Sequence, residues 1–202
     1  NFAALPLLVL ALTGSGVLMG IVGVLSQLPD LIFGLPVGAL ADRWDRRRMM
    51  LLADAGRAAL VALIPISAML GMDTMAVVLL VTFPINTFRV LFMAGWTAAV
   101  PNLVGRAYIG RAVSLFEAVL SLSYIVGPAL AGVLVGIIGP AQTLAIQAVA
   151  FAVSALSLTL IRRPFRATGS APQRHLLVEI GEGIAFIRRH PTLRAMVAWW
   201  TA

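Results

Sequence analysis

The stretch that decides the fold reads Gly38-Ala39-Leu40-Ala41-Asp42-Arg43-Trp44-Asp45-Arg46-Arg47-Arg48. It places four arginines and two aspartates between two long apolar runs, residues 16–41 and 49–70. Each run is longer than the roughly 20 apolar residues that a helix needs to cross a bilayer core of about 30 Å. Because arginine resists translocation, a short basic loop between two spans marks the cytoplasmic face. The stretch therefore predicts an integral membrane protein and gives its orientation.

The composition supports this prediction. Of the 202 residues, 60% are hydrophobic and only 11% are charged, whereas about a quarter of a soluble domain is charged. The net charge of +7 rests on fifteen arginines, which lie in short segments between apolar runs rather than on one basic face. That placement argues against nucleic acid as a partner. The absence of cysteine excludes disulfides and thiolate metal sites, and we expect no metal and no cofactor.

Six apolar segments follow one another along the chain, and we expect them to be helices because lipid offers no water to unpaired backbone groups. The sequence therefore predicts an all-α membrane protein, a six-transmembrane-helix bundle whose first span is truncated. Prolines inside the segments fit this prediction, since neighbouring helices in a membrane re-satisfy the backbone. The segments cover residues up to 12, then 16–41, 49–70, 75–100, 112–138 and 141–161, and these prolines are Pro29, Pro36, Pro65, Pro84 and Pro128.

The arginines alternate between the two sides of this predicted bundle. Thirteen of the fifteen follow the second, fourth or sixth segment, and the links after the third and fifth segments hold none. The arginines that follow the fourth segment lie in a polar link over residues 101–111. We therefore expect the loops after spans 2, 4 and 6 to be cytoplasmic. The thirteen are Arg43, Arg46, Arg47, Arg48, Arg106, Arg111, Arg162, Arg163, Arg166, Arg174, Arg188, Arg189 and Arg194.

The C-terminal part of the chain has a different character, beginning with a linker rich in proline, glycine, serine and arginine. From His175 onward, apolar residues recur at helical spacing opposite charged ones, which predicts an amphipathic helix on the cytoplasmic surface. We expect a transmembrane bundle over 1–161, a cytoplasmic linker with this helix over 162–192, and the start of a seventh span over 193–202. Because the chain begins without methionine and its first apolar run is too short to span, we expect a longer parent protein.

The opening stretch resembles the signature of the major facilitator superfamily between the second and third spans. That signature has a glycine, three further residues, an aspartate, a basic residue and then more basic residues. Asp45 departs from it, because the family usually has glycine at that position. Small Gly38 would allow a neighbouring helix to come close, and the arginines would anchor the cytoplasmic end. The matching residues are Gly38, Asp42, Arg43, Arg46 and Arg47.

The fifth segment carries a second match, which resembles the antiporter motif of exporters in this superfamily. Gly127, Pro128 and Gly132 fit that motif, while Ser123 and Ala131 stand where the family has glycine. Small residues at this spacing allow close helix packing, and the proline permits a bend.

Residues 99–106 and 54–57 resemble the drug and siderophore exporter branch, which includes macrolide-efflux and enterobactin-exporter proteins. The resemblance covers nearly the whole chain. It implies the first half of a twelve-span protein and the start of span seven, so that the C-terminal half of the same protein would be a partner. The implied fold is two six-helix bundles built from inverted three-helix repeats that rock around a central site.

Five ionisable residues lie at membrane depth, where they are costly and therefore candidates for function. Asp30 and Arg89 each lie twelve residues, or about 18 Å along a helix, from the cytoplasmic end of their span. We therefore predict a buried Asp30–Arg89 pair that closes in one state and breaks on protonation or substrate binding in another. Asp54 and Arg57 lie three apart on one helix face and are expected to neutralise each other and hold helices together near the cytoplasmic gate, with a role in transport as the alternative. Glu117 could bind a cationic substrate, pair with Arg57, or reach toward the interface.

These patterns favour a secondary transporter that exports a small amphipathic compound in exchange for protons, in the bacterial cytoplasmic membrane. No phosphate-binding loop is present and the chain has no lysine, so ATP-driven transport within this chain is excluded. An enzyme is not expected, because no cluster of His, Asp and Glu lies at an aqueous rim. An importer of the same superfamily, or a membrane sensor with this fold that does not transport, remains an alternative. The expected partners are the lipid bilayer, a small-molecule substrate and protons.

Overall fold

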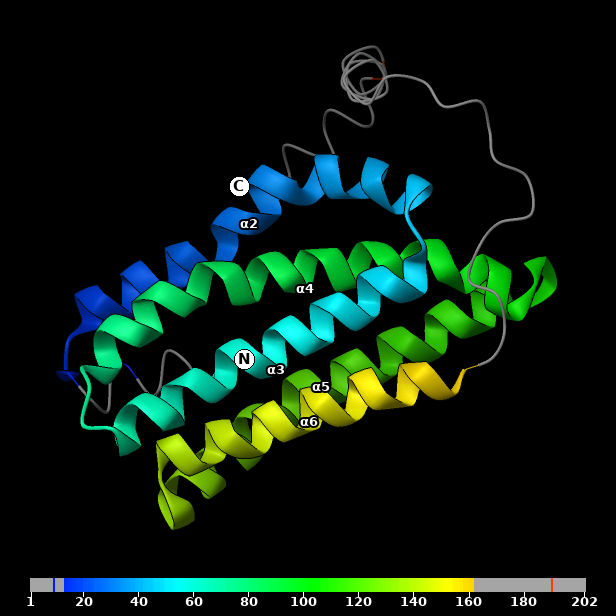
Figure 1. Cartoon of the computed structure of the whole chain (residues 1–202). Helices are drawn as coiled ribbons and strands as arrows, with labels where there is room; N and C mark the ends of the chain where they lie inside the picture. The colour runs from blue at the N-terminus through cyan, green and yellow to red at the C-terminus, as the bar shows by residue number, and fades with distance from the viewer. Residues whose placement is uncertain (1–8, 10–12, 162–189, 191–202) are drawn as a thin grey trace.

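The computed structural model describes residue 9, residues 13–161 and residue 190, and within them the chain forms five long α-helices and one short 3-10 turn (Figure 1). All five helices are long and apolar enough to cross a membrane. The first predicted span, the linker with its amphipathic helix and the start of span seven lie outside these residues, apart from Val9 and His190. The elements are α2 (Gly16–Arg43), α3 (Arg46–Met69), α4 (Thr74–Val104), η1 (Arg106–Tyr108), α5 (Ile109–Ile138) and α6 (Pro140–Leu160).

The predicted segments two to six correspond to these helices, and the differences lie at the links. Only Trp44 and Asp45 separate α2 from α3, because Arg43 ends α2 and the other arginines expected in this loop begin α3. The polar link predicted over 101–111 is also shorter, since α4 continues through Pro101 to Val104 and α5 already begins at Ile109. In a membrane bundle a proline near a helix end does not stop the helix.

Polar residues fix the beginnings of the helices. Ser15 begins α2 by accepting a hydrogen bond from the backbone of Leu18. The Asp45 carboxylate accepts from the backbone N–H groups of Arg47 and Arg48 at 3.0 and 3.2 Å, and so begins α3. Asp73 begins α4 in the same way. These side chains satisfy donors that a helix start leaves without partners. Asp45, which departs from the family signature, therefore has a local structural role.

The helices run back and forth, so that alternate connections gather at the two ends of the bundle (Figure 1). We call the end that holds the α2–α3 turn, the α4–α5 turn and the end of α6 the arginine-rich end. The opposite end holds the α3–α4 turn and Gly139. Gly139 has a φ of +86°, a left-handed conformation that favours glycine, and it lets α6 begin directly at Pro140.

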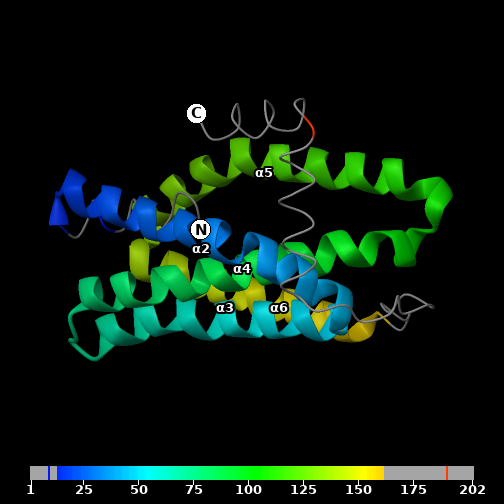
Figure 2. The same cartoon turned by 90° about the horizontal axis from the view of Figure 1, so that it is seen from above.

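The core lies between α3 and its two neighbours, α4 and α6, while α2 packs against α4. At Gly95 the seam between α3 and α4 is so close that an added Cβ would lie 2.9 Å from the Met50 side chain and 3.3 Å from the Arg46 carbonyl oxygen. α5 differs from these helices, because none of its residues is buried in the described part of the chain. Figure 2 shows α5 running along the side of the molecule opposite α3.

Candidate functional site

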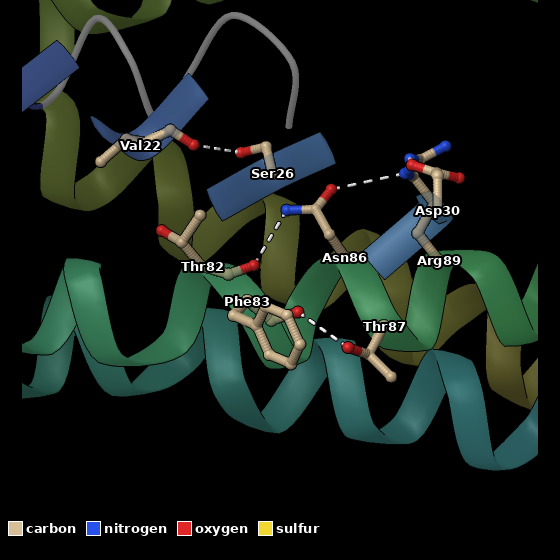
Figure 3. Close-up of polar contacts among 8 residues, drawn as sticks. All are labelled: Val22, Ser26, Asp30, Thr82, Phe83, Asn86, Thr87 and Arg89. Carbon is tan, nitrogen blue, oxygen red and sulfur yellow. Dashed lines mark hydrogen bonds and ion pairs between the residues drawn. The ribbon is translucent and has the colours of Figure 1, made fainter. Parts of the chain in front are cut away.

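The Arg89 guanidinium on α4 forms an ion pair with the Asp30 carboxylate on α2 (Figure 3). The two residues are 59 positions apart in the sequence, so the pair joins two separate helices. Asp30 lies thirteen residues before the end of α2, and Arg89 fifteen before the end of α4. At 1.5 Å per residue, both are about 20 Å from the arginine-rich end. The contact predicted from their equal depth is therefore formed.

A buried amide positions the Arg89 side chain. The Asn86 side-chain oxygen accepts a hydrogen bond from Arg89 Nε at 3.4 Å, and its nitrogen donates to the Thr82 carbonyl at 2.9 Å. One chain of polar contacts therefore runs from α4 to α2 through Thr82, Asn86, Arg89 and Asp30 (Figure 3). Sequence analysis did not count Asn86 among the candidate site residues, although its position three residues before Arg89, on the same helix face, could have indicated it.

The Asp30–Arg89 pair is not buried, and in this respect the prediction was wrong. The Asp30 side chain is 47% exposed and that of Arg89 is 33% exposed. The reason is that α2 packs mainly on α4 and leaves this face of the α2–α4 contact open. An open groove of about 460 Å³ lies along α2, the helix that carries Asp30, and its lining includes Gly23, Gln27 and Leu31 but not Asp30 itself. Gln27 is three residues before Asp30, so an amide, a carboxylate and apolar surface occur together on one face.

The second pair, Asp54–Arg57, is confirmed within α3, and it is buried. Its side chains are 1% and 10% exposed. The second Asp54 oxygen accepts a hydrogen bond from the Ser154 hydroxyl on α6 at 2.6 Å. A buried ion pair is stable only when further hydrogen bonds satisfy it, and Ser154 supplies one.

Two aromatic rings enclose the Arg57 guanidinium. Its central carbon lies 4.7 Å from the centre of the Phe92 ring on α4 and 4.5 Å from that of Phe151 on α6. Both distances are typical of cation–π contacts. Arg57 and Asp54 therefore hold three helices together in the core. Sequence analysis expected the pair but missed Ser154, Phe92 and Phe151, because nothing in uniformly apolar helices shows which faces meet.

The signature residues at the arginine-rich end have several environments. Arg47 Nε donates to the Leu158 carbonyl at 3.0 Å, and Arg47 also donates to the Thr159 carbonyl, so a cation meets the C-terminal end of α6. Arg46 is buried at the start of α3. The backbone of Asp42 and Arg43 forms the last turn of α2, and their side chains lie outside the described part of the chain.

The close helix approach expected at the small residues of the two motifs is not made within the described residues. A Cβ added at Gly38, Gly127 or Gly132 would meet no atom within 4 Å. Pro128 lies inside α5, as expected of a membrane helix. The whole of α5 around this motif is a largely exposed apolar surface in the described part of the chain.

Glu117 lies on α5, exposed, eight residues after the helix begins. It forms no ion pair with Arg57 or with any other residue in the described part of the chain, because Arg57 is already paired with Asp54. Glu117 instead lines a small pocket together with Trp96 and Phe116. No group of three metal-binding side chains occurs among residues 9, 13–161 and 190.

Five long apolar helices with paired charges at membrane depth define an integral membrane protein. The chain belongs to the major facilitator superfamily, since the family described as "Transmembrane secretion effector" matches residues 3–201. This match confirms the resemblance read from the loop and helix motifs. It also places the chain in a family of transporters rather than of enzymes.

Curated relatives agree with this family. The chain is 36% identical to the multidrug efflux pump Tap of Mycolicibacterium fortuitum, over 97% of the chain and 50% of the relative. It is 33% identical to Tap of Mycobacterium tuberculosis, over 97% and 48%, and 27% identical to macrolide efflux protein A of Streptococcus pyogenes, over 92% and 46%. The chain thus spans about half the length of the curated relatives it matches. No solved structure matches the chain.

Proposed function

We propose that this chain is the N-terminal half of a proton-coupled efflux transporter of the bacterial inner membrane, which moves a small amphipathic compound by alternating access. The observation that carries the proposal is the half-exposed Asp30–Arg89 pair between α2 and α4. An ionisable residue at membrane depth that can reach water is able to exchange a proton across the membrane potential. The names of the relatives, efflux pumps for multiple drugs or for macrolides, support export as the direction.

The proposed coupling follows from the charges of the pair. Ionised Asp30 holds the Arg89 guanidinium and thereby joins α2 to α4. Protonation of Asp30 removes its negative charge, so the ion pair is lost and α2 is released from α4. Asn86 keeps Arg89 in place during this step, since it accepts from Arg89 Nε and donates to the backbone of its own helix. The released Arg89 would favour deprotonation of Asp30 again once the carboxyl faces the other side.

The proposed binding surface lies on α2, the helix that carries Asp30. The groove along this helix combines apolar side chains with the Gln27 amide, and such a surface suits a compound with one polar and one apolar part. In this proposal the C-terminal half of the same protein supplies the rest of the central cavity. α5 would form part of the contact between the N-terminal and C-terminal halves, because the surface around its motif residues is free of neighbours in the described part of the chain.

The proposal also assigns the arginine-rich end to the cytoplasm. Arg46, Arg47, Arg48 and Arg111 all lie at the end where α2 joins α3 and α4 joins α5. Positive charge in short loops marks the cytoplasmic side of a membrane protein. Reporter tags at Gly71 and at Trp44 test this orientation, because the two positions should report opposite compartments.

Transport into inverted membrane vesicles that contain the full-length protein tests the proposed function. An acidic vesicle lumen should drive accumulation of ethidium or of a macrolide when the wild type is present. Asp30→Asn should lose this uphill accumulation and keep downhill exchange, because the neutral amide cannot carry a proton. Asp73→Asn is the matched control, since asparagine also begins helices well and Asp73 lies at the opposite end. Uphill transport by Asp30→Asn at the rate of the wild type would contradict the proposal.

A further inference from the structure

A small pocket of about 150 Å³ lies between α4 and α5, near the turn that joins them. Trp96 lies eight residues before the end of α4, and Glu117 lies eight residues after the start of α5. Both are therefore at the same level, about 12 Å from the arginine-rich end. This level is separate from that of the Asp30–Arg89 pair, which lies about 8 Å deeper along the helices.

Two aromatic rings and one carboxylate define the chemistry of this pocket. The rings of Trp96 and Phe116 are stacked, with centres 4.5 Å apart and an angle of 28° between their planes. Among the described residues that line the pocket, Glu117 is the one with a charge, and the others are apolar apart from the Thr97 hydroxyl. That hydroxyl is already engaged, because it donates to backbone carbonyls of its own helix. An incoming ligand therefore meets aromatic faces and a negative charge.

The same chain shows how such a set of groups is used. In the core, the Asp54 carboxylate and the rings of Phe92 and Phe151 together hold the Arg57 cation. The pocket has the same three components in Glu117, Trp96 and Phe116. Here, however, the two rings stack on each other and leave only their outer faces open, and no cation of the described part of the chain pairs with Glu117. Arg111 lies six residues before Glu117, which puts it about 120° away around the helix.

We propose that the pocket of Trp96, Phe116 and Glu117 binds the charged head of an amphipathic organic cation. An anion would be repelled by Glu117, and a neutral compound would cover the carboxylate without pairing it, which costs free energy. Aromatic faces attract quaternary ammonium groups in particular. The volume suits a group of trimethylammonium size rather than a whole drug, because complete drug sites are about 300 Å³ or larger. The apolar part of the ligand would lie outside, along the exposed face of α5.

This binding site stands on its own geometry, but the conclusion that the bound cation is cargo rests on the proposed function. Its level near the arginine-rich end makes it a place where a cation would enter from the inner leaflet before it reaches the central groove. The site therefore adds a chemical class to the proposed cargo, an organic cation with an apolar body.

Equilibrium dialysis of benzyltrimethylammonium against the full-length protein in phosphatidylcholine nanodiscs tests the site, with empty nanodiscs as the blank. We expect Glu117→Gln and Trp96→Leu each to weaken binding roughly three- to tenfold. Binding of benzyl alcohol, the neutral counterpart, should change little in Glu117→Gln. Glu117 is exposed and unpaired in the described part of the chain, so its replacement leaves the core intact.

Asp30→Asn is the matched acid-to-amide control, since Asp30 is the exposed acid of the other site. Cation binding should survive in this variant even though proton coupling is lost, so that the two proposals fail separately. Wild-type affinity in Glu117→Gln would overturn the cation site. So would the absence of binding to the wild type, or loss of binding in Asp30→Asn alone.

Discussion

The two ion pairs of this chain have the same chemistry and opposite surroundings. Asp54–Arg57 lies within α3, is buried, and is completed by Ser154 and by two phenylalanine rings. Asp30–Arg89 joins two helices and keeps 47% and 33% of its side chains exposed. A buried pair resists change, because separating its charges leaves each of them buried and unpaired. The exposed pair lacks such an enclosure in the described part of the chain. The comparison supports our proposal that Asp30–Arg89 responds to protonation while Asp54–Arg57 holds the bundle together.

The largest expected effect on stability comes from breaking the buried pair. Arg57→Leu leaves the Asp54 charge buried with only the Ser154 hydroxyl as a partner. We expect a loss of about 3–5 kcal/mol in the free energy of unfolding, seen as loss of folded protein and a lower melting temperature in detergent.

The double variant Asp54→Leu with Arg57→Leu is the control for this prediction. It removes both charges, and most of the stability should return. If Arg57→Leu alone melted like the wild type, the buried pair would not hold the three helices.

The second-largest loss of stability is expected at the close contact between α3 and α4. Gly95→Leu places side-chain atoms where Met50 and the Arg46 carbonyl already lie. Overpacking of this kind costs about 1–3 kcal/mol, which a shift in melting temperature measures. Gly16→Leu is the matched control, because an added Cβ there meets nothing within 4 Å. Equal melting of the two variants would show that α3 and α4 are less closely packed than described.

A smaller effect is expected at the arginine-rich end. Arg47→Gln removes two hydrogen bonds to the last carbonyls of α6 and a positive charge at a helix C-terminus. The expected loss is about 1 kcal/mol. Arg48→Gln should be near neutral, since the exposed Arg48 side chain makes no such contact in the described part of the chain. A larger loss in Arg48→Gln than in Arg47→Gln would reverse this assignment.

The sequence was sufficient to predict the five described helices, apart from their ends at the links, and the contact of Asp30 with Arg89. Uniform hydrophobicity marks a membrane helix, and the number of residues from a basic loop gives depth, so charges at equal depth could be matched. Depth does not give the direction in which a side chain points. For that reason the exposure of the Asp30–Arg89 pair was predicted wrongly, and Ser154, one hundred residues from Asp54, was missed.

The first turn of α3 shows a different limit. The four arginines of the opening stretch were read together as one loop, on the basis of charge. Asp45 is a strong helix-starting residue, and its carboxylate accepts from Arg47 and Arg48. The preference of Asp45 for a helix start therefore determines where α3 begins. The arginine charge bears only on which side of the membrane this end faces.

The smallest effect on stability is expected at the exposed pair, and there the effect on function should be largest. Asp30→Asn removes an ion pair that is partly open to solvent, and such pairs contribute about 0–1 kcal/mol. Its melting temperature should stay close to that of the wild type. A large loss of stability would mean that Asp30–Arg89 serves the bundle in the same way as Asp54–Arg57.

The most direct test of the central claim is the number of protons that move with each substrate molecule in proteoliposomes of the full-length protein. Proton flux and ethidium flux are measured together for the wild type, for Asp30→Asn and for the Asp73→Asn control. The account predicts that Asp30→Asn still moves ethidium down its gradient but moves one proton fewer per ethidium than the other two. An unchanged ratio in Asp30→Asn would contradict the claim that the half-exposed pair couples protons to transport.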